Sequence, residues 1–430
     1  MKMRFVTLGC KVNQYETEAL KELLENEGGL TVAEEGETPD IFLLNSCTVT
    51  AESDRKTRQT LRHYKRKYPD CITVLFGCMA QNQPDAAAKL SADIVFGNTD
   101  HKKLYHSIME YINGGASGIT VEPHITKETY QTPSVSSFSE RTRAYMKIED
   151  GCNRFCSYCA IPYARGRVRS RDTESIKNEA KQLSDNGYKE VVLVGINLSA
   201  FGQDTDSDIC DAVEAVGKIE GIERIRLGSL EPDHISDEML NRLYKVKQFC
   251  PQFHLSLQSG CDETLKRMNR HYDTEFYADL VRRIKMRFED ASVTTDIMVG
   301  FAGETDEEFQ KSLEFVKSQG FAKCHVFTYS KREGTAAVKL GGHIPNSVKQ
   351  RRAALMLNAA EEAQKSFLRG MVNKTEKVLF ETEKDGYIEG YTENYTRVRV
   401  KTDIPLSNEI CEVYLERVCG DYIEGKIAEK

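Results

Sequence analysis

The segment CNRFCSYC, residues 152–159, decides which fold and chemistry we expect of this chain. Cys152, Cys156 and Cys159 have the spacing C-x₃-C-x₂-C, and the next cysteine is Cys210. A loop this short can hold three corners of a [4Fe–4S] cluster and leave the fourth iron open for an exogenous ligand. A zinc site completed by a distant histidine is the alternative, which the spacing disfavours because no second cysteine pair lies nearby.

Cysteine content and apolar patterning narrow the class of protein. The 430-residue chain carries 13 cysteines, an odd number, and we recognise neither a signal peptide nor an apolar run long enough to span a membrane. In a reducing compartment cysteines are more often metal ligands, catalytic groups or core residues than disulfides. We therefore expect a soluble, cytoplasmic protein with no membrane partner and, from its length, about three domains.

Strand and helix patterns alternate after the quoted segment. Within residues 138–370, six strand patterns are each followed by a charged amphipathic stretch, which favours an open, partial (β/α) barrel over a closed barrel of eight. The three cysteines follow the first of these strands, at the strand end where barrel enzymes place their chemistry. The expected strands are residues 144–150, 189–198, 224–230, 253–260, 293–301 and 323–330.

Residues 1–114 are expected to form a separate α/β domain around a parallel sheet. Three of its strand patterns end in a cysteine, in LGC, NSC and FGC, and these are Cys10, Cys47 and Cys78. Parallel strands bring their carboxyl ends to one edge of a sheet, so these positions predict a second three-thiolate site. Cys71 begins a strand and does not share this placement. Plain core packing is the alternative for each cysteine taken alone.

Two further segments complete the expected organisation. Residues 115–137 are polar, contain Gly, Ser and Pro, and are expected to link the first domain to the core of residues 138–370. Residues 371–430 contain short strands broken by Gly and Asn, which is typical of a small antiparallel barrel. This segment has nine basic and thirteen acidic residues, and its basic residues alternate between 397 and 401, so that they share one outward face.

Two basic segments indicate a polyanionic partner. Residues 55–67, RKTRQTLRHYKRK, contain seven basic residues and no acidic one, with Arg58 and Arg62 at helical spacing. Residues 141–171 contain eight basic and two acidic residues. Such segments bind a phosphate backbone by neutralising its charge and releasing counterions. A solvated helix face and a basic loop are the alternative, but the nearness of both segments to the cysteines favours nucleic acid.

These motifs together resemble the radical S-adenosylmethionine superfamily and, within it, the methylthiotransferases. The matching segments are LGCKVNQYET, NSCTVT, FGCMAQ, GCNRFCSYC with IPYARGRVRSR, HLSLQSG and TDIMVGFAGET. They run nearly from end to end of the chain, and the C-terminal barrel corresponds to the module called TRAM, which is linked to RNA or substrate binding. The resemblance thus implies an α/β fold with a parallel-sheet domain, a partial TIM-like barrel and a TRAM barrel.

The resemblance also implies roles for individual residues. Cys152, Cys156 and Cys159 would hold the radical cluster, whose open iron binds S-adenosylmethionine and supplies the electron that cleaves it to a 5′-deoxyadenosyl radical. A second [4Fe–4S] cluster would carry the sulfur to be inserted, and its implied ligands are Cys10, Cys47 and Cys78. The residues implied to face S-adenosylmethionine are Tyr158, Gly195, Asn197, Glu231, Gln258 and Asp296. Ordinary turn chemistry at strand ends is the alternative for the last five.

The implied activity is methylthiolation of tRNA. LGCKVNQYET is most similar to the enzymes that act on N6-threonylcarbamoyladenosine next to the anticodon, where the methylthio group enters carbon 2 of the adenine. Isopentenyladenosine in tRNA and an aspartate of a ribosomal protein are alternative substrates, and the acidic C-terminal segment suits the latter. The reaction would need an external one-electron reductant and a sulfur donor. A metal-stabilised RNA-binding protein without catalysis is the alternative from another class.

Overall fold

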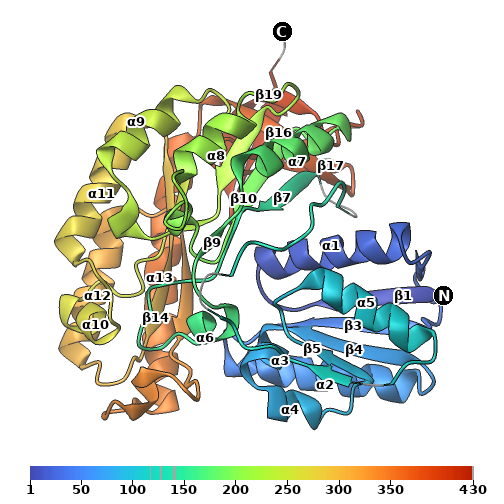
Figure 1. Cartoon of the computed structure of the whole chain (residues 1–430). Coiled ribbons are helices and arrows are strands. Elements are labelled where there is room, and N and C mark those ends of the chain that lie inside the picture. The colour runs from blue at the N-terminus through green and yellow to red at the C-terminus, as the bar shows by residue number, and fades with distance from the viewer. Residues whose placement is uncertain (117, 126–127, 139–141, 429–430) are drawn as a thin grey trace.

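The computed structural model describes residues 1–116, 118–125, 128–138 and 142–428. Figure 1 shows an α/β unit at the N-terminus in blue, a curved arrangement of strands and helices from green to orange, and a small barrel at the C-terminus in red. Arg141, one of the eight basic residues within 141–171, lies outside the described residues. No helix in the described ranges is long and apolar enough to cross a bilayer.

The N-terminal part is a six-stranded parallel sheet in the order β2-β1-β3-β4-β5-β6. Every residue of β3 is buried, as expected of a strand covered on both faces. Helices α1 and α5 pack on one face, and α2, α3 and α4 pack on the other. The strands are β1 (Lys2–Thr7), β2 (Thr31–Val32), β3 (Ile41–Ser46), β4 (Ile72–Gly77), β5 (Ile94–Phe96) and β6 (Gly118–Thr120). The helices are α1 (Lys11–Asn26), α2 (Ala51–Lys67), α3 (Cys78–Asn82), α4 (Pro84–Ala88) and α5 (His101–Ile112).

Strand β6 falls within residues 115–137, the segment predicted as a linker. It pairs in parallel with β5 and so adds an edge strand to the N-terminal sheet.

Helix α2 has the two faces that its sequence predicts. Leu61 is fully buried, Tyr64 stacks on Phe42 with ring centroids 3.8 Å apart, and Arg62 and Arg66 are exposed.

The central part is an open (β/α) barrel, as predicted. Its strands form two parallel sheets, β7-β10-β11 and β12-β13-β14-β15, and Gly228 separates β11 from β12. The strands are β7 (Arg143–Lys147), β10 (Glu190–Val194), β11 (Arg224–Leu227), β12 (Ser229–Leu230), β13 (Gln252–Leu255), β14 (Ser292–Val299) and β15 (Lys323–Thr328). A short pair, β8 (Glu149–Asp150) and β9 (Arg169–Ser170), flanks the three-cysteine loop and the short helix α6 (Ile161–Arg165).

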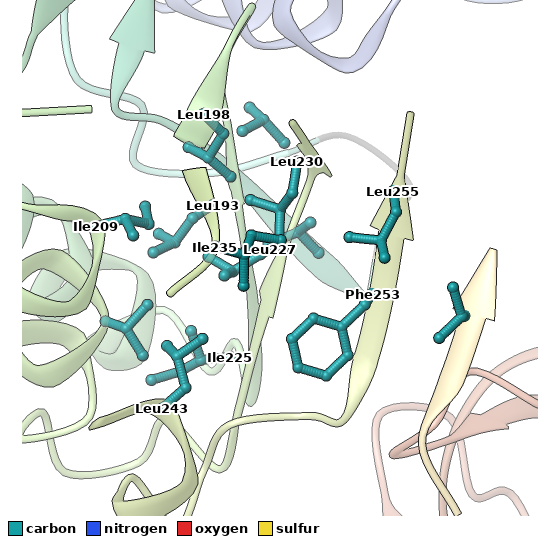
Figure 2. Packing of buried hydrophobic residues seen from close by; sticks show 14 of the residues in the cluster. Leu193, Leu198, Ile209, Ile225, Leu227, Leu230, Ile235, Leu243, Phe253 and Leu255 are labelled. Atoms are coloured by element: carbon teal, nitrogen blue, oxygen red, sulfur yellow. The ribbon is translucent and has the colours of Figure 1, made fainter. Parts of the chain in front are cut away.

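Long helices cover the outer face of this open barrel and enclose an apolar core (Figure 2). Leu193, Leu227 and Leu255, on β10, β11 and β13, belong to this core together with Ile209 and Leu243 of the covering helices. The helices are α7 (Thr173–Asp185), α8 (Ile209–Val216), α9 (Asp237–Lys245), α10 (Asp262–Arg267), α11 (Thr274–Arg287), α12 (Asp306–Gln319) and α13 (Asn346–Met371). This layer leaves the strand ends and the concave side free for a site.

The C-terminal segment is a closed five-stranded barrel in the order β16-β17-β18-β20-β19. Val398 and Val400 are buried inside it, while Arg397, Arg399 and Lys401 point outward, so the predicted alternation is confirmed. Both arginines pair with an acidic residue of β17. The strands are β16 (Thr375–Lys384), β17 (Tyr387–Thr392), β18 (Arg397–Lys401), β19 (Ile410–Cys419) and β20 (Tyr422–Ile427).

Buried hydrogen bonds join the three parts. Arg332, after β15, donates to Asp54 Oδ2 at 2.7 Å and to Thr48 Oγ1 at 2.6 Å in the N-terminal part. Arg224 and Arg226, on β11, donate to backbone carbonyls at the end of β17 and just beyond it. These contacts fix the N-terminal sheet and the small barrel against two different places on the open barrel.

Candidate functional site

Cys10, Cys47 and Cys78 lie at the carboxyl ends of three neighbouring strands. Cys10 lies between β1 and α1, Cys47 follows β3, and Cys78 follows β4. Because β1, β3 and β4 are adjacent and parallel, these positions meet at one edge of the sheet. Gly9 has a positive φ, and a Cβ added there would lie 3.0 Å from Cys47 Sγ, so the approach of this turn to Cys47 needs a glycine. Cys71 lies at the opposite end of β4.

Polar side chains from other elements point at these thiols. Arg165 Nε donates to Cys78 Sγ at 3.2 Å, and Asn98 Nδ2 lies 3.7 Å from the same sulfur. Asn13 Oδ1 accepts from Cys10 Sγ at 3.4 Å and from Arg165 Nη2 at 3.0 Å. Burial raises the pKa of the Cys78 thiol, whereas Arg165 lowers it. Nitrogen donors aimed at sulfur are a feature of iron–sulfur sites, where they tune the cluster.

The three thiols of residues 152–159 are half-buried in the loop between β8 and α6. Gly151 opens this loop with a positive φ, and a Cβ there would lie 1.9 Å from the carbonyl oxygen of Arg167. Each sulfur accepts a hydrogen bond. The donors are the backbone amides of Arg154 and Ile161, each 3.4 Å from Cys152 and Cys159 respectively, and Arg270 Nη1, 3.3 Å from Cys156.

Both thiol sets fit an iron–sulfur cluster in their donor chemistry. Each supplies three sulfurs and surrounding N–H donors. In the described part of the chain, no three His, Cys, Asp or Glu side chains are arranged as ligands of a single metal ion. The cysteines of a [4Fe–4S] cluster bind separate irons, so their sulfurs need not meet at one point.

Gly195 and Asn197 follow β10 and enclose a buried carboxylate beside the loop. A Cβ added at Gly195 would lie 2.5 Å from Glu149 Oε2, and the backbone amide of Asn197 donates to that oxygen at 2.8 Å. Burial raises the pKa of Glu149 to about 8. Asn197 Nδ2 lies 3.7 Å from Cys152 Sγ. Glu149 Oε1 and Asn197 Oδ1 are buried without a partner among the described residues, which suits a site for a polar ligand.

Glu231 lies beside this loop, and Tyr158 is part of it. Glu231 accepts a hydrogen bond from Arg270, the residue that donates to Cys156, so one guanidinium connects the carboxylate with the thiol. Tyr158 packs edge-on against Phe301, with ring centroids 6.2 Å apart. Arg270 was not among the predicted site residues. Nothing in its local pattern distinguishes it from a surface arginine.

Gln258, just beyond β13, lies next to Asp296, which is on β14. Gln258 has a φ of 68°, and its backbone amide donates to the carbonyl of Asp296 at 2.8 Å. A left-handed conformation at a non-glycine residue is uncommon and clusters at functional sites. Asp296 Oδ2 lies 3.3 Å from His254 Nε2. The structure thus places Tyr158 in the cysteine loop, four residues just beyond strand ends and Asp296 inside β14; the four are Gly195, Asn197, Glu231 and Gln258.

A cavity of about 820 Å³ opens where the three parts of the molecule meet. Cys10 and Lys11 line it from the N-terminal part, Gly195 and Asp296 from the open barrel, and Tyr395 from the C-terminal barrel. The predicted second cluster site, through Cys10, and the predicted S-adenosylmethionine site, through Gly195 and Asp296, therefore border the same cavity.

Arg165, at the end of α6, joins the two cysteine sites and was not predicted. Its side chain is fully buried. Besides Cys78, its guanidinium donates to both carboxylate oxygens of Glu16 and lies 3.3 Å from the carboxylate of Asp150. Lys147 Nζ contacts the same two carboxylates at 2.7 and 2.6 Å. Arg165 ends the helix that directly follows the loop of Cys152, Cys156 and Cys159. Its contact with Cys78 therefore connects this loop with the N-terminal set of thiols.

The basic segment 141–171 does not form the expected phosphate-binding surface. In its described part, only Arg167 is exposed and free of a salt bridge. Carboxylates, most of them from distant segments, neutralise the others inside the protein. The pairs are Arg143–Glu381, Lys147–Glu16, Arg154–Asp233, Arg165–Glu16, Arg169–Glu128 and Arg171–Glu179.

Comparison with known proteins agrees with this geometry. The family model "Radical SAM superfamily" matches residues 146–316, and the model "Uncharacterized protein family UPF0004" matches residues 2–97. The structure of the radical S-adenosylmethionine methyltransferase TsrM from Kitasatospora setae has a TM-score of 0.58 at 15% identity, covering 76% of this chain and 74% of that one. With its open barrel and cysteine loop, the chain is a radical S-adenosylmethionine enzyme, a class that uses a [4Fe–4S] cluster and S-adenosylmethionine.

Full-length relatives narrow the family. The threonylcarbamoyladenosine tRNA methylthiotransferase MtaB of Bacillus subtilis is 37% identical over 98% of this chain and 95% of its own length. The protein of the same name from Thermotoga maritima is 36% identical over 99% and 98%. The tRNA-2-methylthio-N(6)-dimethylallyladenosine synthase of Pelotomaculum thermopropionicum is 34% identical over 96% and 94%. The chain belongs to the radical S-adenosylmethionine methylthiotransferase family.

Proposed function

We propose that this protein transfers a methylthio group to carbon 2 of N6-threonylcarbamoyladenosine next to the anticodon of tRNA. The observation that carries the reaction is the cavity bordered by Cys10 and by Gly195 and Asp296, because it lets a sulfur-carrying site and a radical site reach one base. The relatives of 37% and 36% identity support this nucleoside as the substrate. A tRNA substrate would place the enzyme in the cytoplasm.

The thiols divide into two cluster sites in this proposal. Cys152, Cys156 and Cys159 hold the cluster that works with S-adenosylmethionine, and Cys10, Cys47 and Cys78 hold a second [4Fe–4S] cluster. Bound there, the cofactors supply one-electron chemistry that activates a carbon–hydrogen bond, and they supply the sulfur. An external reductant and a sulfur donor complete the reaction.

The chain's own residues orient these groups. Arg270 holds Glu231 against the loop of residues 152–159, and Glu149 fixes the turn at Asn197 through a backbone amide. Asn197 lies beside Cys152 and Tyr158 lies within the cysteine loop, where they bind the polar and aromatic parts of S-adenosylmethionine. Asp296, to which the backbone amide of Gln258 donates, extends this binding surface to the wall of the cavity.

Isopentenyladenosine in tRNA is the second candidate substrate, because relatives of 34% identity carry a dimethylallyladenosine synthase name. Mass spectrometry of tRNA nucleosides from cells with and without this protein separates the two. We expect the 2-methylthio form of threonylcarbamoyladenosine to disappear and its precursor to accumulate in the deletion strain. If only the 2-methylthio form of isopentenyladenosine disappeared, the proposed substrate would be wrong, but methylthio transfer to tRNA would still be the reaction.

The exposed face of α2 is expected to contribute to tRNA binding. We expect an Arg58→Glu, Arg62→Glu double variant to weaken binding and to lower the slope of log K against log salt by about 1 to 2, because each lost phosphate contact removes one released counterion. Salt titrations of tRNA binding to the holoenzyme measure this slope. The charge-matched control is Lys177→Glu with Arg282→Glu, both exposed on helices of the open barrel. An equal loss in both double variants would mean that net charge, and not α2, sets the affinity.

A further inference from the structure

Lys11 is a cation that lines the cavity next to the predicted sulfur-carrying site. It directly follows Cys10 as the first residue of α1, and its side chain is exposed. Its Nζ lies 5.7 Å from the centroid of the Tyr145 ring, which also lines the cavity. Lys11 forms no salt bridge or side-chain hydrogen bond with the described part of the protein.

The arginines around Lys11 already have partners. Arg143 pairs with Glu381 and donates to Tyr395 Oη at 2.6 Å. Arg226 donates to Glu190 at 2.7 Å and to two backbone carbonyls. Arg397, at the far side of the cavity, pairs with Glu389 and Asp421 in the same way. These guanidiniums shape the wall of the cavity and leave few donors for a ligand.

The placement of Lys11 is unfavourable for the folded protein alone. A positive charge at a helix N-terminus opposes the helix dipole, and α1 has no acidic residue in its first turn to offset it. Arg143 and Arg226 line the same cavity and add further positive charge. An anion entering the cavity would relieve this repulsion and gain a charge-assisted hydrogen bond.

The proposed substrate brings such an anion. The threonylcarbamoyl group on N6 ends in a carboxylate, whereas the isopentenyl group is apolar. Carbon 2 and the carbon bearing N6 are separated by one ring nitrogen, so the N6 substituent enters the cavity close to the atom that receives sulfur. A base that presents carbon 2 to the edge holding Cys10 therefore brings its N6 substituent near the neighbouring residue, Lys11.

We propose that Lys11 binds the carboxylate of the N6 substituent and so determines the substrate. This inference rests on the proposed function. A phosphate of the tRNA backbone would also attract a lysine, but it would do so regardless of the N6 substituent. Replacing the carboxylate of the N6 substituent by a carboxamide therefore distinguishes binding of this substituent from binding of a backbone phosphate.

The test uses anaerobically reconstituted holoenzyme and three anticodon stem-loop RNAs. One carries threonylcarbamoyladenosine, one carries its carboxamide, which is isosteric and uncharged, and one carries isopentenyladenosine. We expect wild-type enzyme to prefer the acid over the amide by about 10-fold to 100-fold in kcat/KM, the usual effect of a charge-assisted hydrogen bond. The Lys11→Gln variant should lose most of this preference, because its kcat/KM falls on the acid RNA and stays unchanged on the amide RNA. The Lys11→Arg variant should keep part of the preference.

Controls keep the outcomes distinct. Lys323→Gln removes another exposed cation of the same cavity and should leave the acid-to-amide ratio unchanged. Iron content shows that each variant is assembled, and RNA affinity with S-adenosylmethionine bound reports acid preference without turnover. An unchanged ratio in Lys11→Gln, or an equal loss on all RNAs, would overturn the role of Lys11. Failure of wild-type enzyme on both the acid and the amide would instead count against the proposed function.

Discussion

A Cys152→Ala variant is expected to lose reductive cleavage of S-adenosylmethionine, whereas a Cys47→Ala variant keeps cleavage and loses methylthio transfer. The two thiols belong to different elements, the loop after β8 and the end of β3, so each change removes a proposed ligand from only one of the two proposed cluster sites. Wild-type protein should hold about eight irons, and each variant about four. Iron analysis, release of 5′-deoxyadenosine under a chemical reductant and nucleoside mass spectrometry measure the three quantities.

Cys71→Ala is the matched control for this division of labour. Cys71 is buried like Cys47, but it lies at the opposite end of β4 from Cys78. We expect the Cys71→Ala variant to keep about eight irons and both activities. Product formation by Cys47→Ala at the wild-type rate would show that the thiols at the sheet edge hold no catalytic cluster.

The second large effect is expected from Arg165→Met. Burial by itself raises the pKa of Glu16, but Arg165 and Lys147 bring it down to about 2, so this carboxylate is charged when the protein folds. Removing Arg165 leaves Glu16 and Asp150 with Lys147 as their remaining fully buried cation and removes a donor from Cys78. Breaking a buried ion pair from one side costs about 3–5 kcal/mol.

Anaerobic urea unfolding, followed by circular dichroism and by cluster absorbance, measures this loss. Arg167→Met is the control, because Arg167 lies two residues away, is exposed and makes a cation–π contact with Phe155. We expect its cost to be about 1 kcal/mol or less. Equal stability of the two variants would contradict a structural role for the buried network, and an Arg165→Met protein with full iron content would separate folding from cluster assembly.

Strands and helices could be predicted from the sequence wherever buried residues recur with the period of a strand or a helix. The end-of-strand positions of Cys10, Cys47 and Cys78 follow from three apolar runs that each stop at a cysteine. The two faces of α2 and the alternation between residues 397 and 401 follow from helical and strand periodicity in the same way. The open barrel follows from the order of six strand patterns, and the resemblance in the cysteine motifs supplied the chemistry.

Charge pairing was not readable from the sequence. The segment 141–171 is as basic as a nucleic-acid-binding loop, yet Arg165 and Lys147 are buried against Glu16, more than a hundred residues away. Arg270, although distant in the chain, reaches Cys156 only because the segments that follow β8 and β13 meet at one end of the barrel. Lys11, by contrast, has no such partner among the described residues and lines the cavity. The sequence determined by itself which residues form strands, helices and thiol motifs, because those depend on neighbours along the chain. Only the tertiary structure decided which charges are neutralised and which remain free for a substrate, because that depends on which distant carboxylates the fold brings within a few ångströms.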